Sequence, residues 1–354
     1  MKVLNSYDRT EKPEPEVFMK TRQIIVQQNG TGDVTTLKEA FALAMQESPE
    51  TAVEIRIGAG VYKEKLELER DNVTLLGEGA DKVILEFGDY GLFLMPDGIK
   101  RGTFRSYTLY VHGDKFTAKG ITFKNTAGYG PKIGQAVAVY ADGARMIFEN
   151  CRFEGRQDTL FTAPLPPTVV EWGGFRGPRE HAPRDNGTHY YKNCYIEGDV
   201  DFIFGGATAY FEECEIKSLD RGQEVNGYVT AASTPEDREY GYVFDRCRFT
   251  SDCAPETVYL GRPWRSFAKT VIMRSELGAH IKKEGWHDWN KEDARELAFY
   301  AEYENFGPGA DMTQRVAWSR QLTEEEACQY TKEKVLRELL TETEEPWKNA
   351  DFLN

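Results

Sequence analysis

Short runs of alternating apolar and polar residues recur along the middle of the chain, each with a cysteine at the same place. The repeated frame has an aromatic residue, two mostly polar residues and then Cys-x-aromatic or Cys-x-Ile; it occurs at Phe148–Phe153, Tyr191–Ile196, Phe211–Ile216 and Phe244–Phe249. Such alternation is typical of a β-strand with one buried face, so the cysteines are predicted to face inward as reduced thiols.

The spacing of the frames predicts a solenoid. Val73–Leu75 and Ile121–Phe123 fill the equivalent place earlier in the chain, and the four cysteines follow one another at intervals of 43, 20 and 33 residues. One rung is therefore about 20 residues, with loops protruding from some rungs. Unequal loops on a regular stack of short strands favour a parallel β-helix.

Helical patterns flank the repeats. Residues 35–45 have helical periodicity with Thr35 or Thr36 as N-cap, and Thr323-Glu324-Glu325-Glu326 has the form of a capping box. We expect an N-terminal arm over residues 1–22 and one domain over 23–354. The segment 164–188, rich in Pro, Gly and Arg, is predicted to be an inserted loop.

Composition narrows the function classes. Of 354 residues, 40% are apolar and 12% aromatic, which supports an ordinary packed core. The net charge of −14 disfavours nucleic acid or an anionic membrane as partner. Residues 1–22 are charged and have no apolar leader, so a cytoplasmic location is expected, or secretion if a leader had been removed.

Several types of site are disfavoured. The six cysteines include no CxxC pair, and the five histidines follow no metal-binding spacing, so no metal and no cofactor are expected. Buried reduced cysteines fit a reducing compartment. No serine lies in a G-x-S-x-G motif, which disfavours a Ser-His-Asp hydrolase.

Three short blocks combine ionisable or amide groups with apolar neighbours: residues 155–160 (GRQDTL), 201–205 (DFIFG) and 260–264 (LGRPW). Together they supply two carboxylates, an amide and a guanidinium. These groups suffice for ester cleavage without a serine or a metal, because one carboxylate attacks, the other moves protons and the amide stabilises the oxyanion.

These blocks resemble signature segments of the pectin methylesterases (pectinesterases), carbohydrate esterases, here of the bacterial type. Further similar blocks follow in the expected order from about Gln28 to Ala327: residues 30–33, 60–64, 121–128, 135–138, 285–289 and 302–310. The resemblance implies an all-β fold, a right-handed parallel β-helix with a short N-terminal capping helix and a C-terminal helical segment. It also implies hydrolysis of galacturonate methyl esters with release of methanol.

The resemblance assigns roles to individual residues. It implies that Asp201 is the nucleophile, Asp158 the proton donor and Arg262 the partner that keeps Asp201 charged. The sequence alone favours this order because the carboxylate without the arginine should hold its proton, but it leaves the reverse order open. Gln157 and Gln135 are candidate oxyanion donors. Since Gln157 and Asp158 are adjacent, both can serve only if the backbone turns between them.

Four aromatic residues are candidates for stacking on sugar rings, namely Trp264, Phe202, Tyr140 and Trp286. The expected partner is methylesterified homogalacturonan or an oligogalacturonide, and the protein is expected to be a monomer. Three alternatives remain: an esterase with the same groups acting on an acetylated sugar or a thioester, a polysaccharide lyase, and a non-catalytic carbohydrate-binding β-helix.

Two features depart from the family pattern. The family's Thr-Ala-Gln-Gly-Arg run is replaced by Thr-Ala-Ala-Ser-Thr at 230–234, which affects substrate contacts rather than the four central groups. The two aspartates are 43 positions apart because of the segment 164–188, which is expected to narrow the cleft and favour short oligosaccharides.

Overall fold

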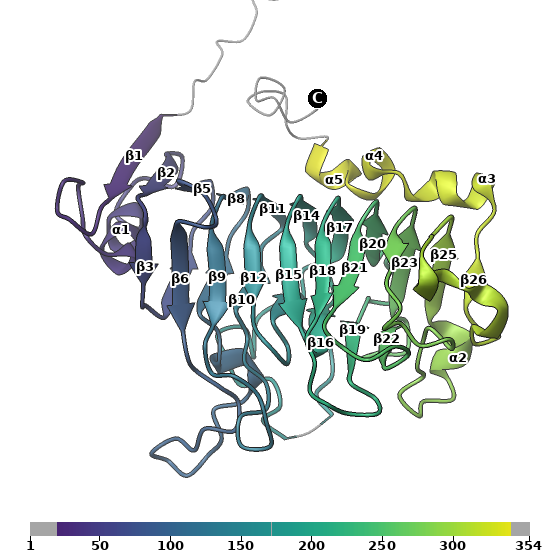
Figure 1. Ribbon diagram of the computed structural model, residues 1–354. Helices are drawn as coiled ribbons and strands as arrows, with labels where there is room; N and C mark the ends of the chain where they lie inside the picture. Colours follow the sequence, from purple (N-terminus) through teal and green to yellow (C-terminus); the bar gives the residue numbers. More distant parts are fainter. Residues whose placement is uncertain (1–19, 171, 341–354) are drawn as a thin grey trace, which may run out of the picture.

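Three sheets of parallel strands form the body of the computed structural model, which describes residues 20–170 and 172–340 (Figure 1). Sheet A contains β1 (Thr21–Val26), β2 (Ala52–Ile57), β5 (Val73–Gly77), β8 (Phe116–Lys119), β11 (Arg145–Glu149), β14 (Thr188–Lys192), β17 (Thr208–Glu212), β20 (Tyr242–Asp245), β23 (Lys269–Met273), β25 (Phe299–Tyr303) and β26 (Arg320–Gln321). Sheet B contains β3 (Gly60–Tyr62), β6 (Val83–Phe87), β9 (Thr122–Asn125), β12 (Arg152–Glu154), β15 (Tyr195–Gly198), β18 (Glu215–Ser218), β21 (Arg248–Ser251) and β24 (Glu276–Leu277). Sheet C contains β4 (Leu66–Glu69), β7 (Leu109–His112), β10 (Val139–Asp142), β13 (Leu160–Thr162), β16 (Val200–Gly205), β19 (Gly227–Ala232) and β22 (Val258–Gly261).

The chain visits the three sheets in turn, so consecutive strands belong to one coil and each strand pairs with its equivalent in the next coil. For example, β11, β12 and β13 are followed by β14, β15 and β16, which pair with them in parallel. This arrangement is a parallel β-helix, which confirms the predicted fold class.

The repeated cysteine frame is not one alternating strand, as predicted, but two strands meeting at a corner. In these four frames a residue with positive φ directly follows the sheet A strand: Asn150 (53°), Asn193 (49°), Glu213 (55°) and Arg246 (55°). The left-handed conformation turns the chain into sheet B, and the following cysteine points inward. Cys151, Cys194, Cys214 and Cys247 are free thiols with at most 2% exposure, so the inward orientation is confirmed.

Aromatic rings stack along the interior beside these corners. The rings of Phe148, Tyr191, Phe211 and Phe244 lie nearly parallel, with successive centroid separations of 5.1, 4.6 and 4.4 Å. Equivalent residues in adjacent coils lie about one strand spacing apart, roughly 4.8 Å, so the first residue of each frame packs on the next. The frame therefore builds a continuous core and fixes the coil register.

Helices cover one end and one face. α1 (Leu37–Ala44) begins at Thr36, whose side chain forms a capping box with Glu39, and Glu64 of the 60–64 block accepts hydrogen bonds from the Leu37 and Lys38 N–H groups. At the other end, the Thr323 capping box opens α3 (Glu324–Ala327), and α4 (Lys332–Val335) and α5 (Arg337–Leu340) follow across sheet A (Figure 1). Both predicted helical regions, the N-cap at Thr36 and the capping box at Thr323 are confirmed, and Thr36 also forms a capping box that was not predicted.

The remaining short helices lie in loops: α2 (Ala294–Leu297) and the 3₁₀ turns η1 (Thr103–Arg105), η2 (Pro308–Ala310), η3 (Met312–Gln314) and η4 (Cys328–Tyr330). None of the described helices combines the length and apolar character needed to cross a membrane. Most of the expected arm, residues 1–19, lies outside the described residues, while Thr21 already begins β1. Between β13 and β14, residues 164–170 and 172–187 contain no helix or strand.

Candidate active site

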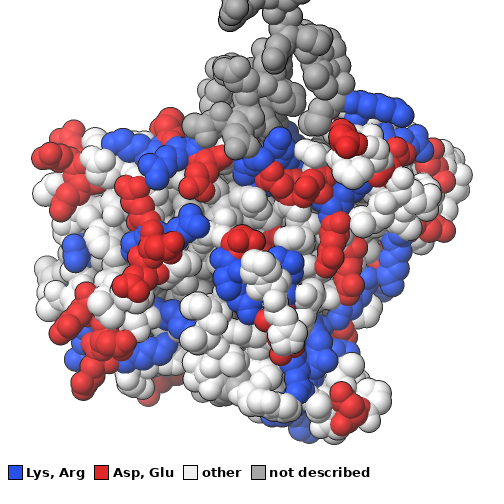
Figure 2. Space-filling view, turned by 180° about the vertical axis from the view of Figure 1, so that it is seen from behind, with Lys and Arg blue, Asp and Glu red and all other residues white. Residues whose placement is uncertain are grey.

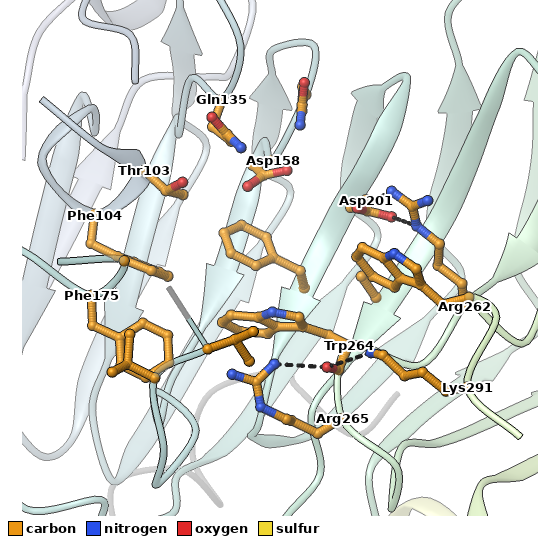
Figure 3. Close-up of a pocket in the computed structure, with 17 residues that line it drawn as sticks. Thr103, Phe104, Gln135, Asp158, Phe175, Asp201, Arg262, Trp264, Arg265 and Lys291 are labelled. Carbon is orange, nitrogen blue, oxygen red and sulfur yellow. Dashed lines mark hydrogen bonds and ion pairs between the residues drawn. The ribbon is translucent and has the colours of Figure 1, made fainter. Parts of the chain in front are cut away.

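A cavity of about 430 Å³ opens on the outer face of sheet C, and polar groups from several coils converge in it (Figure 3). Six predicted site residues line this cavity: Gln135, Gln157, Asp158, Asp201, Arg262 and Trp264. They come from four of five consecutive coils, those of β10, β13, β16 and β22, so residues far apart in sequence meet because the β-helix stacks equivalent positions.

Asp158 and Asp201 occupy equivalent positions in adjacent coils. Each precedes by two residues a member of the Leu160–Ile203 pair that joins β13 to β16, and the Asp158 N–H donates to the Val200 carbonyl at 3.0 Å. Their backbones are therefore about one strand spacing apart, roughly 4.8 Å. Their exposures of 8% and 7% leave both carboxyl groups largely shielded from water.

Both aspartates have left-handed backbone conformations, with φ of 64° at Asp158 and 51° at Asp201. Such a conformation is uncommon for a residue other than glycine and interrupts strand alternation. The register between β16 and β19 shifts at this point, between Val200 and Ile203. As a result Asp201 lines the cavity while both Phe202 and Ile203 lie in the core.

Arg262 fixes the orientation of the Asp201 carboxylate. Its Nε and one terminal nitrogen donate to the two carboxylate oxygens at 2.8 and 2.7 Å. The guanidinium lies 3.8 Å from the Tyr228 ring centroid and 3.7 Å from that of Trp289, so it is held between two aromatic rings. A bidentate arginine with both faces covered has little freedom to turn away from its partner.

The two carboxyl groups differ in the charges around them, and therefore in what sets their pKa values. Burial raises the pKa of Asp158 well above its usual value, and the Asp201 charge raises it further. Burial also raises the pKa of Asp201, but the Arg262 guanidinium opposes this effect. Asp158 is therefore suited to holding a proton and Asp201 to remaining ionised, which agrees with the order implied by the sequence.

Gln135 lies beside Asp158 from the neighbouring coil (Figure 3), and Gln157, which directly precedes Asp158, lines the same cavity. The Ala136 N–H donates to the Gln157 carbonyl at 3.0 Å, which places the two segments in adjacent positions. The left-handed turn at Asp158 lets both Gln157 and Asp158 line the cavity, as the sequence argument required. Both amides are thus near the position where an oxyanion would form, although their roles stay predictions.

Three of the four predicted stacking residues are not in the cavity. Phe202 and Tyr140 have 0% exposure, and Trp286 has 1%. Phe202 lies inside the β-helix, Tyr140 packs within the aromatic cluster on the outer face of sheet C, and Trp286 stacks on Tyr300 at 4.3 Å. Assigning these rings to sugar stacking was therefore wrong, because neighbouring side chains cover them; Trp264 alone of the four lines the cavity.

Several lining residues were missed by sequence reasoning. Trp289 is the last residue of the 285–289 block and Lys291 lies two positions after it, Arg265 directly follows Trp264, and Phe175 lies in the segment 164–188. The proximity of Arg265 and Lys291 to recognised blocks could have indicated them. Phe175, in contrast, is in a segment without periodicity and gave no signal.

Among residues 20–170 and 172–340, no group of three or more His, Cys, Asp or Glu side chains is arranged to hold a metal ion. Besides the two aspartates, the polar side chains that line the cavity are mainly cations and amides, and no His, Cys or further acidic side chain of the described residues lines it. The expected absence of a metal or cofactor stays a prediction.

Comparison with known proteins gives consistent matches. The family model described as Pectinesterase matches residues 23–165 and 181–338. Pectinesterase 31 of Arabidopsis thaliana is 35% identical over 316 residues, 87% of this chain and 90% of the relative. The chain spans about half the length of several other curated relatives.

Solved structures agree with these matches. Pectin methylesterase from carrot has a TM-score of 0.75 and 30% identity, covering 91% of this chain and 96% of that one. A pectin methylesterase in complex with a hexasaccharide has a TM-score of 0.73 and 29% identity, covering 88% and 96%. Residues 166–180 fall outside both segments matched by the family model.

The expectation of a cytoplasmic location is wrong. The relatives include plant pectinesterases from Arabidopsis and Petunia, enzymes whose substrate, pectin, belongs to the cell wall. The error has a simple cause: the expectation relied on the composition of residues 1–22, and composition at the start of a given sequence does not define the compartment in which the protein works.

Proposed function

Because the chain belongs to the pectinesterase family, we propose that it hydrolyses methyl esters of galacturonate in pectin or oligogalacturonides by a covalent aspartyl mechanism. One observation carries this proposal: the carboxylate of Asp201, gripped by Arg262, lies one coil away from the buried carboxyl group of Asp158. That pair provides a nucleophile and a proton donor next to each other.

In the first step a carboxylate oxygen of Asp201 attacks the C6 carbonyl carbon of the ester. The bond from that carbon to the methoxy oxygen breaks, and the proton of Asp158 passes to the departing oxygen, which leaves as methanol. The product is an anhydride between Asp201 and galacturonate. Arg262 keeps the attacking group ionised and oriented, so no base is needed to activate it.

Negative charge develops on the carbonyl oxygen during this attack. The side-chain amides of Gln157 and Gln135 are the neutral donors beside Asp158 in the cavity, and we assign the oxyanion to them. Neutral donors suit this position because they stabilise the transient charge without neutralising Asp201 in the resting enzyme.

In the second step Asp158, now ionised, accepts a proton from water as the water attacks the anhydride carbonyl. This attack breaks the anhydride bond and restores both aspartates to their starting states, and the galacturonic acid released loses its proton to solvent. Asp158 therefore acts first as acid and then as base, for which a carboxyl with a strongly raised pKa is suited.

The cavity also indicates how a sugar would be held. Trp264 lines it together with Trp289, so two aromatic side chains are placed beside the reacting groups. The solved pectin methylesterase–hexasaccharide complex supports binding of a pectic oligosaccharide by this family. We further propose that residues 23–354 act as one domain with the inserted segment 164–188, and that the protein works as a monomer.

Product analysis tests the function. The protein is incubated with a fully methylated trigalacturonide, and methanol and the de-esterified sugar are quantified. We expect one methanol for each carboxylate formed and no ultraviolet-absorbing unsaturated sugar. Unsaturated product would instead establish lyase chemistry, and acetate or thiol release from acetylated or thioester substrates, without methanol, would contradict the assignment.

A further inference from the structure

Two charged side chains outside the cavity form an ion pair between the same two coils as the aspartates of the cavity. Asp199 lies two residues before Asp201, and Arg156 lies two residues before Asp158. The Arg156 Nε and the Asp199 Oδ2 are 2.9 Å apart. Neither residue lines the cavity, so the ion pair has no direct part in the proposed reaction.

The Asp199 carboxylate is buried and held from several sides. Only 1% of its side chain is exposed, and its Oδ1 accepts the Val200 N–H at 2.7 Å. The Asp199 N–H donates to the Arg156 carbonyl at 3.0 Å, and the Asp199 carbonyl accepts the Tyr228 N–H at 3.1 Å. Asp199 is therefore fixed to the preceding and the following coil directly before the turn that carries Asp201.

Arg156 links four consecutive coils where sheet B connects to sheet C. Its guanidinium lies 4.1 Å from the ring centroid of Tyr129, in the connection that also carries Gln135. A terminal nitrogen donates to the Asp220 carbonyl at 2.8 Å, in the connection that precedes β19. Together with the ion pair to Asp199, these contacts join the connections that carry a candidate oxyanion donor, the proposed acid and the proposed nucleophile.

The backbone around the ion pair leaves little room for these turns to shift. A Cβ at Gly198 would lie 2.6 Å from the Arg156 carbonyl oxygen, and a Cβ at Gly227 would lie 1.9 Å from the Asp199 carbonyl oxygen. Because the coils are in such close contact, a shift of either ion-pair residue also moves the backbone that carries the aspartates of the cavity.

The ion pair also acts through its charge on the proton of Asp158. Burial is the main cause of the raised pKa of Asp158, and the charged groups that modify this pKa are Asp201, Arg262 and Asp199. The two aspartates raise the pKa, and the arginine lowers it. Burial raises the pKa of Asp199 as well, but Arg156 and Arg221 oppose this effect. Loss of the Asp199 charge would therefore make the Asp158 proton easier to remove.

We propose that the Arg156–Asp199 ion pair positions the reacting groups: it fixes the spacing of the turns that carry Asp158 and Asp201, and it keeps a negative charge near the proton donor. This inference rests on the proposed function, because the ion pair acts through the acid and the nucleophile rather than on the substrate. Arg156 and Asp199 are thus positioning residues, which affect the chemical step more than the binding of the sugar.

Asp199→Asn tests the proposal with fully methylated trigalacturonide, which has no titrating carboxyl group. The amide keeps an acceptor for the Val200 N–H but removes the charge. We expect kcat for methanol release to fall about tenfold with KM changed by less than about threefold, since small displacements of reacting groups slow the chemical step. The alkaline limb of the kcat/KM profile should move to lower pH, because Asp158 loses its proton more readily.

Two substitutions at Arg156 separate its charge from its packing. Arg156→Met keeps an apolar side chain against Tyr129 but removes the charge, and it should lower kcat about tenfold or more. Arg156→Lys keeps a cation and should restore kcat to within about threefold of the native value. Equal kcat values for folded methionine and lysine variants would show that the charge of Arg156 has no positioning effect.

Asp245→Asn is the matched control. Asp245 is as deeply buried as Asp199, at 1% exposure, and it pairs with Arg246 and Arg274 on sheet A, outside the cavity. Its substitution should lower the melting temperature but leave kcat and the alkaline limb unchanged. Native kcat and an unshifted limb in folded Asp199→Asn would overturn the positioning role while leaving the esterase function intact.

If the native protein releases no methanol, the proposed function fails, and the titration of Asp158 still tests the ion pair. Carbon-13 NMR of protein labelled at the aspartate carboxyl groups reports this titration, with Asp158→Asn to assign the resonance. We expect a lower pKa for Asp158 in Asp199→Asn than in the native protein, because a neighbouring negative charge is lost. Equal values would overturn the inference.

Discussion

At the scale of single residues, the two aspartates show how one neighbour can separate two chemically identical groups. Asp158 and Asp201 share a position in the coil, a left-handed conformation and deep burial. Only Asp201 has a guanidinium bound to both oxygens. The nucleophile and the acid thus differ because Arg262 binds the carboxylate of Asp201 and not that of Asp158, although both aspartates occupy equivalent strand positions.

The raised pKa of Asp158 predicts a pH-dependent stability effect for Asp158→Asn. The folded protein binds this proton more tightly than the unfolded chain, so wild-type stability is lost as pH rises from about 4 through the folded pKa. The variant has no such loss. Its melting temperature relative to wild type should therefore be higher at pH 8 than at pH 4, as measured by calorimetry; a difference independent of pH would contradict the strongly raised pKa.

Gln157→Ala tests the oxyanion assignment. Removing one donor to a developing oxyanion typically lowers kcat about 100-fold, while ground-state binding changes less. We therefore expect kcat for methanol release to fall by about two orders of magnitude with KM changed by less than about threefold. Gln223→Ala, at an exposed glutamine outside the cavity, is the control. If kcat/KM fell only because KM rose, with kcat unchanged, Gln157 would instead be assigned to substrate binding.

The residues that sequence reasoning placed correctly are those within short blocks that stack in register, such as Asp158, Asp201 and Arg262. Phe202 was misplaced because a strand pattern cannot show a bulge: the left-handed turn at Asp201 sends the next ring into the core. Lys291 and Arg265 lie next to recognised blocks, but they were missed because their position in the cavity depends on how the coils stack.

At the scale of elements, the corners between sheets A and B determine the coil geometry. The four corners of the cysteine frames each contain a residue with positive φ, and asparagine at 150 and 193 tolerates this conformation better than most residues. The Asn193 amide also donates to the Asn150 side chain in the preceding coil at 2.5 Å. Corner residues therefore stabilise both the turn and the stacking of coils.

Substitutions at Asn193 separate these two contributions. Asn193→Ala should lower the free energy of unfolding by about 1–2 kcal/mol, because alanine is strained at positive φ and cannot make the side-chain bond. Asn193→Gly loses the same bond but avoids the strain, so it should be less destabilising. Denaturant unfolding of the two variants provides the measurement; alanine tolerated as well as glycine would show that the corner is not strained.

Elements with a local sequence pattern could be predicted from the sequence, whereas the contacts of the segment without such a pattern could not. The cysteine frames, the N-cap at Thr36 and the capping box at Thr323 are local patterns recognisable within a few residues, and all of them occur in the structure. The residues at 166–170 and 172–180 have no such repeat, since their contacts are to Arg265, Trp264 and Phe104 in other coils. The sequence placed this segment at the cleft, but which of its residues line the cavity could not be inferred before the coils were assembled.

At the scale of the whole molecule, the net charge is negative, but the cavity contains several cationic side chains. Acidic and basic side chains are interspersed over the face shown in Figure 2, and the net charge is −14. The cavity nevertheless holds Arg262, Arg265 and Lys291. Long-range repulsion should therefore oppose approach of a polyanionic polymer, while short-range attraction favours a single carboxylate once it is inside.

Salt separates the two effects. Raising ionic strength from about 0.01 to 0.15 M shortens the screening length from about 30 to 8 Å. We expect kcat/KM on largely de-esterified pectin to rise severalfold, because repulsion is screened, and kcat/KM on fully methylated oligomer to stay nearly constant. A fall with the de-esterified polymer would show that attraction by the cavity dominates at long range as well.

The central claim is that Asp201 is the nucleophile of a methylesterase, and methanol release by Asp201→Asn tests it most directly. Asp252→Asn is the control, since that carboxylate is 62% exposed and outside the cavity. With fully methylated trigalacturonide, we predict a loss of about 1,000-fold or more for folded Asp201→Asn and none for the control. Retention of activity within tenfold of the native protein would contradict the account.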